Sequence, residues 1–169
     1  MASKKGIAIT AAIAAGIIAA SSLIWFIPQS NNGLGSNPRS VQDTFSSAYA
    51  QSNDMAINAN ATYSQWLQGR VSSQALLSNI SQIQNDAASI KDNLVKANPP
   101  SDYQKSFSTY ESALDSLDTY LAKIKAHVSQ SADSQNATAT REPSPDVVSA
   151  WRTWQSNVNE SVGELPVGS

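Results

Sequence analysis

Apolar residues recur at intervals of three and four positions through most of the chain after residue 37, and this spacing places them on one face of an α-helix. The pattern predicts four helices, separated by polar or helix-breaking segments near residues 69–72, 98–101 and 131–144. No segment shows the alternation of apolar and polar residues that is typical of a half-buried β-strand. We therefore predict an all-α fold.

The first predicted helix begins with Asn37 as its cap and Pro38 at its first position, and it ends at Gly69. Its apolar positions keep helical spacing with one break at Ser52, and they are Val41, Phe45, Ala48, Met55, Ala59, Tyr63 and Trp66. The second helix has a cleaner register, formed by Leu76, Ile80, Ile83, Ala87, Ile90 and Leu94. The prolines at 99–100 end it, because proline cannot continue a helix.

The third helix is predicted to open with a capping box, in which Ser101 is followed three residues later by Gln104. Its apolar positions are Tyr103, Phe107, Tyr110, Leu114, Leu117, Leu121, Ile124 and Val128. After the loop, Ser144 and Pro145 open a last helix that Gly163 closes. Its predicted apolar side consists of Val148, Trp151, Trp154 or Gln155, Val158 and Val162.

The short connections make consecutive helices antiparallel neighbours. We therefore predict an antiparallel helical bundle over 38–165, with three long helices and a shorter fourth, followed by a tail at 166–169. A helix of about 30 residues is roughly 45 Å long, so the bundle should be a rod. An apolar stripe about two positions wide in every seven is typical of coiled-coil packing.

The N-terminal part is different, because residues 6–27 form an uncharged apolar run, GIAITAAIAAGIIAASSLIWFI. As a helix this run is roughly 33 Å long, enough to cross a hydrocarbon core of about 30 Å. Lys4 and Lys5 precede it and no basic residue follows before Arg39, which puts residues 1–5 in the cytoplasm and the bundle outside. We predict a single-pass signal-anchor in the cell membrane, with a flexible Ser-, Asn- and Gly-rich tether over 28–37.

A cleaved signal peptide is the alternative, because Ala12-Ile13-Ala14 resembles a cleavage site. Cleavage there would leave a mature chain that begins with a strongly apolar stretch, which favours an anchor that is retained. One face of the predicted span carries a small residue at every fourth position, at Ala8, Ala12, Gly16 and Ala20. Membrane helices approach closely through such faces, so the span could join two copies of the chain or bind another membrane protein.

Composition narrows the possible chemistry. The chain has no cysteine and one histidine, which excludes disulfides, zinc fingers and haem attachment through cysteine. A formal charge of -2 with 14% charged residues offers no basic stripe for nucleic acid. The sequence contains no phosphate-binding loop, nucleophile elbow or zinc-protease motif. We expect neither a cofactor nor a metal ion, and we expect that the protein is not an enzyme.

The remaining candidates for chemistry lie on the predicted third helix. His127 is the only imidazole, and no carboxylate stands four residues from it on either side, so we expect a solvated side chain rather than a metal ligand. Glu111, Asp115 and Asp118 share one side of the helix, and we expect them to be solvated or to pair with cations across the bundle.

Two groups of residues are candidates for surface recognition. Trp151, Arg152 and Trp154 combine residue types that dominate protein interfaces, although both indoles could instead pack in the core opposite Trp66 and Tyr63. Asn-x-Ser/Thr acceptor sequences for glycosylation begin at Asn60, Asn79, Asn136 and Asn159. Asn136 lies in the predicted loop and is the most accessible of them.

These features favour a non-enzymatic membrane protein whose outer helical domain binds another membrane or surface protein, as an accessory or stabilising subunit of a complex. The layout of one span followed by an outer bundle is similar to the sensory half of bacterial and archaeal chemoreceptors. An alternative is therefore a sensory or ligand-binding bundle, with a slot lined by Tyr103, Tyr110, Trp66 and Trp154. A structural spacer of the cell envelope is the third possibility.

Overall fold

A computed structural model describes residues 38–132 and 141–165 of the chain. These residues form α2 (Pro38–Leu67), α3 (Ser73–Lys96), α4 (Ser101–Ala132) and α5 (Pro145–Gly163), with no β-strand among them. The predicted all-α class is confirmed for this part of the chain. The predicted span at 6–27, the tether at 28–37 and the tail at 166–169 lie outside the described residues. None of the four described helices is both long and apolar enough to cross a membrane.

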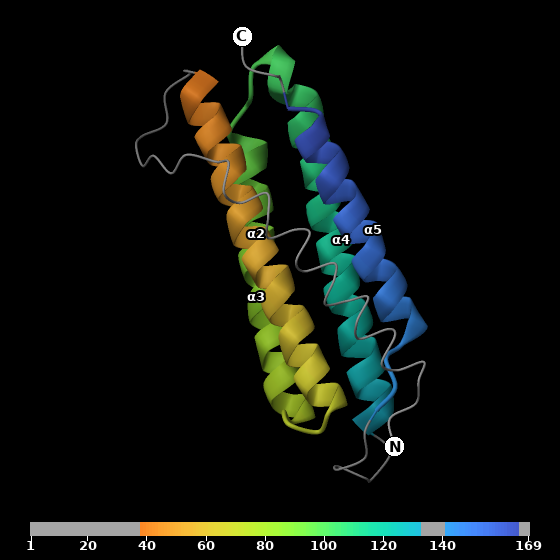
Figure 1. The fold of residues 1–169 in the computed structure, drawn as a ribbon. Helices are drawn as coiled ribbons and strands as arrows, with labels where there is room; N and C mark the ends of the chain where they lie inside the picture. Colours follow the sequence, from red (N-terminus) through yellow and green to blue (C-terminus); the bar gives the residue numbers. More distant parts are fainter. Residues whose placement is uncertain (1–37, 133–140, 166–169) are drawn as a thin grey trace.

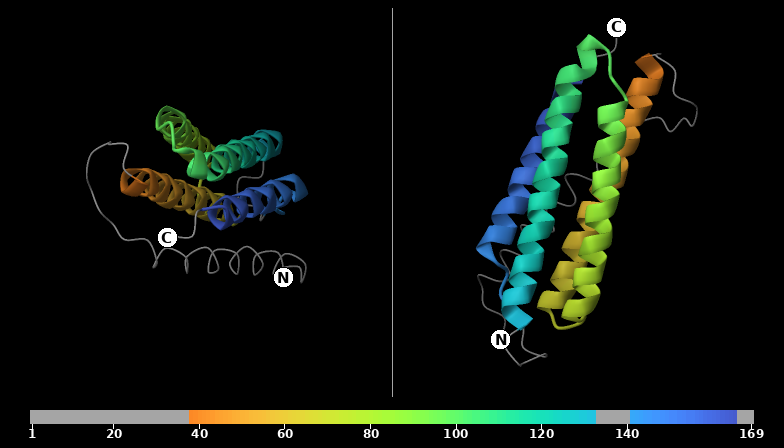
Figure 2. Two further views of the ribbon diagram at one scale, coloured as in Figure 1. Left: turned by 90° about the horizontal axis from the view of Figure 1, so that it is seen from above. Right: turned by 180° about the vertical axis from the view of Figure 1, so that it is seen from behind.

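The helices stand side by side in an elongated antiparallel bundle (Figure 1), and α5 packs most extensively on α4. Seen from above, α2, α3, α4 and α5 follow one another around the bundle (Figure 2). One end of the bundle, the tether end, holds the start of α2 and the end of α5. The opposite end, the loop end, holds the turn at 68–72 and the segment at 141–144 that leads into α5.

The connections follow from local chemistry. α2 ends before Gly69, whose φ of 72° lies in the left-handed region that glycine adopts without strain. Ser72 caps α3 by accepting a hydrogen bond from the amide of Ala75 at 3.2 Å. The predicted capping box of α4 is wrong, because the helix begins at Ser101 itself and this hydroxyl donates to the carboxylate of Asp102 at 3.1 Å.

At the tether end, Glu164 fastens the end of α5 to the start of α4. Its carboxylate pairs with Lys105 at 2.8 Å and accepts a hydrogen bond from the Thr109 hydroxyl at 2.6 Å. The hydroxyl of Ser106 donates to the Glu164 carbonyl at 2.7 Å. The hydrogen bonds from Lys105 and then Thr109 lower the pKa of Glu164 below its usual value, so the carboxylate stays ionised in the folded protein.

The core confirms the predicted register of α3, whose buried residues are Leu76, Ile80, Ile83, Ala87, Ile90 and Leu94. The stripes on α2 and α4 are wider than predicted, because pairs of adjacent residues are buried. These pairs are Ala48–Tyr49, Ser52–Asn53, Ala59–Asn60 and Trp66–Leu67 on α2, and Ser106–Phe107, Ala113–Leu114 and Tyr120–Leu121 on α4. The predicted apolar stripe, about two positions wide in every seven, therefore describes α3 but not α2 or α4.

Individual positions also differ from the prediction. Ser52, which interrupts the apolar pattern, is fully buried, whereas Met55 and Tyr103 are only half-buried. On α5, Val147 and Ser161 are buried in place of Val148 and Val162. Both serines are tolerated inside because each hydroxyl donates to a carbonyl three residues earlier on its own helix, at 3.2 Å for Ser52 and 2.7 Å for Ser161.

Candidate functional site

A groove of about 320 Å³ lies between α4 and α5, on the outer side of the bundle. Its lining is dominated by hydroxyl side chains and consists of Ser116, Thr119, Lys123, Asp146, Ser149, Ala150 and Thr153. Ala150 is 9% exposed and is the one apolar residue of this lining. We call this feature the α4–α5 groove.

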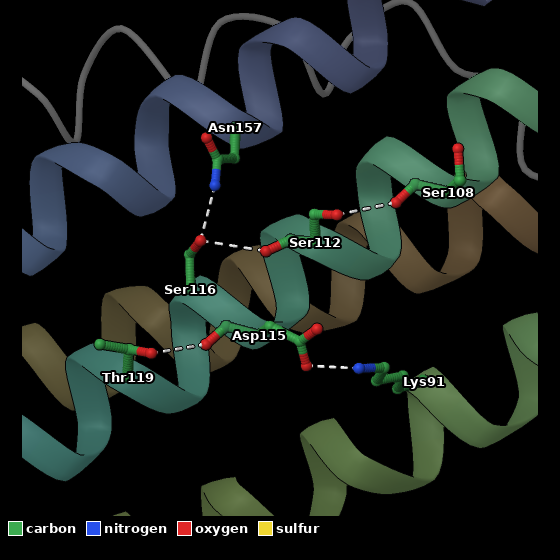
Figure 3. Close-up of polar contacts among 7 residues, drawn as sticks. All are labelled: Lys91, Ser108, Ser112, Asp115, Ser116, Thr119 and Asn157. Atoms are coloured by element: carbon green, nitrogen blue, oxygen red, sulfur yellow. Dashed lines mark hydrogen bonds and ion pairs between the residues drawn. The ribbon is translucent and has the colours of Figure 1, made fainter.

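The α4 wall of the groove belongs to a regular ladder of hydroxyls (Figure 3). The Ser112 hydroxyl donates to the carbonyl of Ser108 at 3.1 Å, and the Ser116 hydroxyl donates to the carbonyl of Ser112 at 3.0 Å. Thr119 donates in the same way to the carbonyl of Asp115 at 2.9 Å. Since these bonds use the hydroxyl hydrogens, the side-chain oxygens are left to act as acceptors.

Polar contacts join the two walls. The side-chain amide of Asn157 on α5 donates to the hydroxyl oxygen of Ser116 at 2.6 Å. On α5 itself, Thr153 donates to the carbonyl of Ser149 at 3.2 Å, as the ladder on α4 does. Nearer the loop end, the ammonium of Lys123 lies 3.2 Å from the carboxylate of Asp146. Both of these charged side chains are exposed, so their ion pair contributes no more than about 1 kcal/mol.

The predicted aromatic interface candidates are inside the bundle. Trp151 is 4% exposed and Trp154 is 2% exposed. Both indoles pack in the core, as the alternative prediction had it, and the ring of Trp151 lies 5.1 Å from that of Tyr120 on α4. Arg152 is exposed on the outer side of α5. The indoles therefore stabilise the packing of α5 on α4 and leave Arg152 as the accessible member of this cluster.

The predicted glycosylation candidates differ in accessibility. Asn60 is 4% exposed and its side-chain oxygen accepts a hydrogen bond from the Tyr120 hydroxyl at 3.2 Å, so a glycan there is incompatible with the folded bundle. Asn79 is half-buried on α3, and Asn159 is exposed on α5. Asn136 and the small residues Ala8, Ala12, Gly16 and Ala20 lie outside the described residues.

The prediction that His127 is solvated is wrong. The side chain is half-buried at the loop end, with Nδ1 2.7 Å from the Tyr63 hydroxyl and the ring 5.4 Å from that of Trp66. Spacing along the sequence relates His127 only to residues on its own helix. In the structure both of its partners come from α2.

Two of the three acidic residues predicted to share one side of α4 contact α3. Asp115 forms an ion pair with Lys91, and Asp118 accepts a hydrogen bond from the side-chain amide of Gln84 at 2.7 Å. Within 38–132 and 141–165, no three His, Asp or Glu side chains gather in a group that could hold a metal ion. These carboxylates therefore serve as cross-links between neighbouring helices.

The α4–α5 groove was missed by sequence reasoning, although one signal for it was available. Ser108, Ser112 and Ser116 are four residues apart and lie beside the apolar stripe of the predicted third helix. The groove offers hydrogen-bond acceptors and one ion pair, an arrangement suited to binding. No protein-family model matches the chain, and neither the curated proteins nor the solved structures include a match to it.

Proposed function

We propose that this chain is a non-enzymatic, single-pass membrane protein whose extracytoplasmic bundle binds another protein through the α4–α5 groove. In this proposal residues 6–27 form the anchor, and the protein serves as an accessory or stabilising subunit of a membrane complex. The observation that carries the proposal is the hydroxyl-lined groove, which is open at the surface and built from two helices that are tightly packed on each other.

The surface chemistry supports a polar contact. Among the described residues, Val95 is the one large hydrophobic side chain that is exposed, at 57%, so they form no apolar patch for a partner. Because the hydroxyl hydrogens of the ladder are used within their own helices, the groove suits a partner that supplies donors. Side-chain amides, ammonium groups and guanidinium groups are such donors.

The open form and the hydroxyl lining of the groove favour protein side chains over a small molecule. Small-molecule sites are mostly concave and apolar, with a few polar groups that orient the ligand. The α4–α5 groove instead has hydroxyls along both walls, with Ala150 as its apolar member. Polar surfaces of this kind are typical of the rims of interfaces and of reversible contacts.

The test places a photo-crosslinking amino acid at Ser149, which is exposed on the α5 wall, in the full chain within its native membrane. The matched control carries the same group at Ser78, which is exposed on α3, away from the groove. A discrete adduct from position 149 that is absent from position 78 supports the proposal. Equal labelling from both positions, or migration of the solubilised protein only as a free monomer, contradicts it.

One observation favours the ligand-binding alternative. The side-chain nitrogens of Asn53 on α2 and Trp154 on α5 are buried without a hydrogen-bond acceptor among the described residues. A small acceptor molecule held inside the bundle would satisfy such donors. A screen of small oxygen-containing solutes against the full chain, read as a raised unfolding midpoint, separates the two candidates. A specific rise that Asn53→Leu abolishes would favour the alternative.

A further inference from the structure

We propose that Tyr63, His127, Arg141 and Ser144 form a pH-sensitive latch at the loop end, which fastens the 141–144 segment across the end of α2 and opens when His127 is protonated. None of these four residues lines the α4–α5 groove, and the inference does not depend on the proposed function. We call these four residues the loop-end latch.

Arg141 supplies the first attachment of the segment. Its backbone amide donates to the carbonyl of Leu67 and its guanidinium donates to the carbonyl of Trp66, both at 2.9 Å. The guanidinium also lies 4.5 Å from the centre of the Trp66 ring. The last carbonyls of a helix have no partner within the helix, and a cation is favourable at that end. Arg141 therefore closes the C-terminus of α2.

Tyr63 supplies the second attachment. The backbone amide of Ser144 donates to the Tyr63 hydroxyl oxygen at 3.2 Å, and this oxygen lies 2.7 Å from Nδ1 of His127. Because an amide can only donate, Tyr63 accepts from Ser144 and has its own hydrogen available for His127. When Tyr63 donates this hydrogen to Nδ1, the imidazole is neutral, with its lone pair on Nδ1 and its hydrogen on Nε2.

The surroundings of His127 oppose its protonation. Arg141, from the segment before α5, is the cation that acts on the imidazole, and Tyr63 faces it from α2 as a neutral phenol. Lys123, one turn earlier on α4, is paired with Asp146 of α5. Burial, and then the charge of Arg141, lower the pKa of His127 below its usual value. Burial raises the pKa of Tyr63 to about 12, so this hydroxyl keeps its hydrogen.

Toward α3, no charged group among the described residues opposes this effect on the pKa of His127. There the indole nitrogen of Trp66 donates to the hydroxyl of Ser73 at 3.0 Å, and the Trp66 ring meets His127 edge to face at 84°. An aromatic wall and a neutral hydroxyl do not stabilise an imidazolium ion as a carboxylate would. The site therefore favours neutral His127.

Protonation weakens both attachments together. A proton on Nδ1 makes His127 a donor, so the Tyr63 oxygen faces two donors and its own hydrogen loses an acceptor. The new positive charge also repels Arg141. Since the pKa of His127 is lowered in the folded state, the latch is fully closed above the unfolded value of about 6.5 and weakens as the pH falls below it.

Amide hydrogen exchange of the full chain in lipid nanodiscs tests the latch between pH 7.5 and 5.5, after correction for the intrinsic rates. The amides of Arg141 and Ser144 should lose protection, by up to about tenfold for each pH unit below the unfolded pKa. The Glu164 amide, bonded to the Glu160 carbonyl at the tether end, is the control and should not change. Unchanged protection of Arg141 and Ser144 would overturn the proposal.

Two further measurements distinguish the latch from a general loss of stability of the folded protein at low pH. His127→Gln can still accept from Tyr63 but does not titrate, so protection should persist and its pH dependence should vanish. The same pH dependence in this variant contradicts the latch. His127 is the only histidine, so selectively labelled protein gives one imidazole signal. A titration midpoint at or above 6.5 in that signal also refutes the proposal.

Discussion

The hydroxyl pair of Ser52 and Tyr110 allows a sharp test of how the bundle holds α2 against α4. Both side chains are buried and their hydroxyls are bonded to each other. Each hydroxyl oxygen also lies near a carbonyl of α2, 3.2 Å from that of Tyr49 for Ser52 and 3.3 Å from that of Ala48 for Tyr110, so the two hydroxyl hydrogens are shared among three contacts. Burial raises the pKa of Tyr110 far above its usual value, so the phenol remains neutral at any ordinary pH.

The expected losses in the free energy of unfolding follow from the hydrogen bonds that each substitution leaves in place. Tyr110→Phe removes one hydroxyl and leaves Ser52 with its own-helix bond, so the free energy of unfolding should fall by about 1–2 kcal/mol. Ser52→Ala removes the other hydroxyl and leaves Tyr110 bonded to the Ala48 carbonyl, so the loss should be about 1 kcal/mol. Each single variant already breaks the shared bond. The double variant should therefore cost less than the sum, by about 0.5–1 kcal/mol.

Urea unfolding of the full chain in mild detergent, followed by helical circular dichroism, gives the four free energies of this cycle. Ser89→Ala is the matched control, because its exposed hydroxyl donates to the carbonyl of Asn85 on the same helix. It should change stability by less than about 0.5 kcal/mol. Strictly additive losses for Ser52 and Tyr110 would refute the reasoning, because they would show that the two hydroxyls are not coupled.

Three further outcomes are expected. Trp151→Ala should lower the free energy of unfolding by about 3–5 kcal/mol in the same urea assay, because the indole is buried, whereas Arg152→Ala should change it by less than about 0.5 kcal/mol. Gly163→Ala should raise the unfolding midpoint, with a gain of about 0.5–1 kcal/mol, since an added Cβ meets no atom within 4 Å in this helical position. The lowered pKa of Glu164 should make stability fall as the pH drops below about 4.5, and Lys105→Ala should reduce this fall in unfolding curves measured from pH 6 to 3.

The sequence predicted helices best where burial depends on apolar spacing alone. On α3 the six buried residues are those of the predicted register, because this helix contributes one narrow stripe to the core. The predicted end of α2 at Gly69 also agrees with the structure, since a positive φ after a helix favours glycine. Both features are local, so they could be predicted without knowledge of the neighbouring helices.

Polar residues inside the bundle could not be predicted in this way. Ser52 interrupts the apolar pattern, and besides its own-helix bond its hydroxyl contacts that of Tyr110, which is 58 positions away in the chain. Asn60 likewise carries an acceptor sequence for glycosylation but is buried against Tyr120. Spacing identifies the face of a helix on which a residue lies, and it does not identify what stands opposite. Arg141 was missed for the same reason, because it contacts α2 from a segment with the composition of a loop.

The buried polar pairs also explain how this bundle fixes the register of helices that are not consecutive. Ser52–Tyr110, Asn60–Tyr120 and Tyr63–His127 each join α2 to α4. Apolar faces tolerate a slide of one helical turn, about 5.4 Å, since one apolar stripe fits another in either position. Such a slide would break all three pairs together, at about 0.5–1.5 kcal/mol for each hydrogen bond that is lost. The polar pairs therefore select a single register. One of them, Tyr63–His127, also belongs to the loop-end latch, so it depends on the protonation of His127.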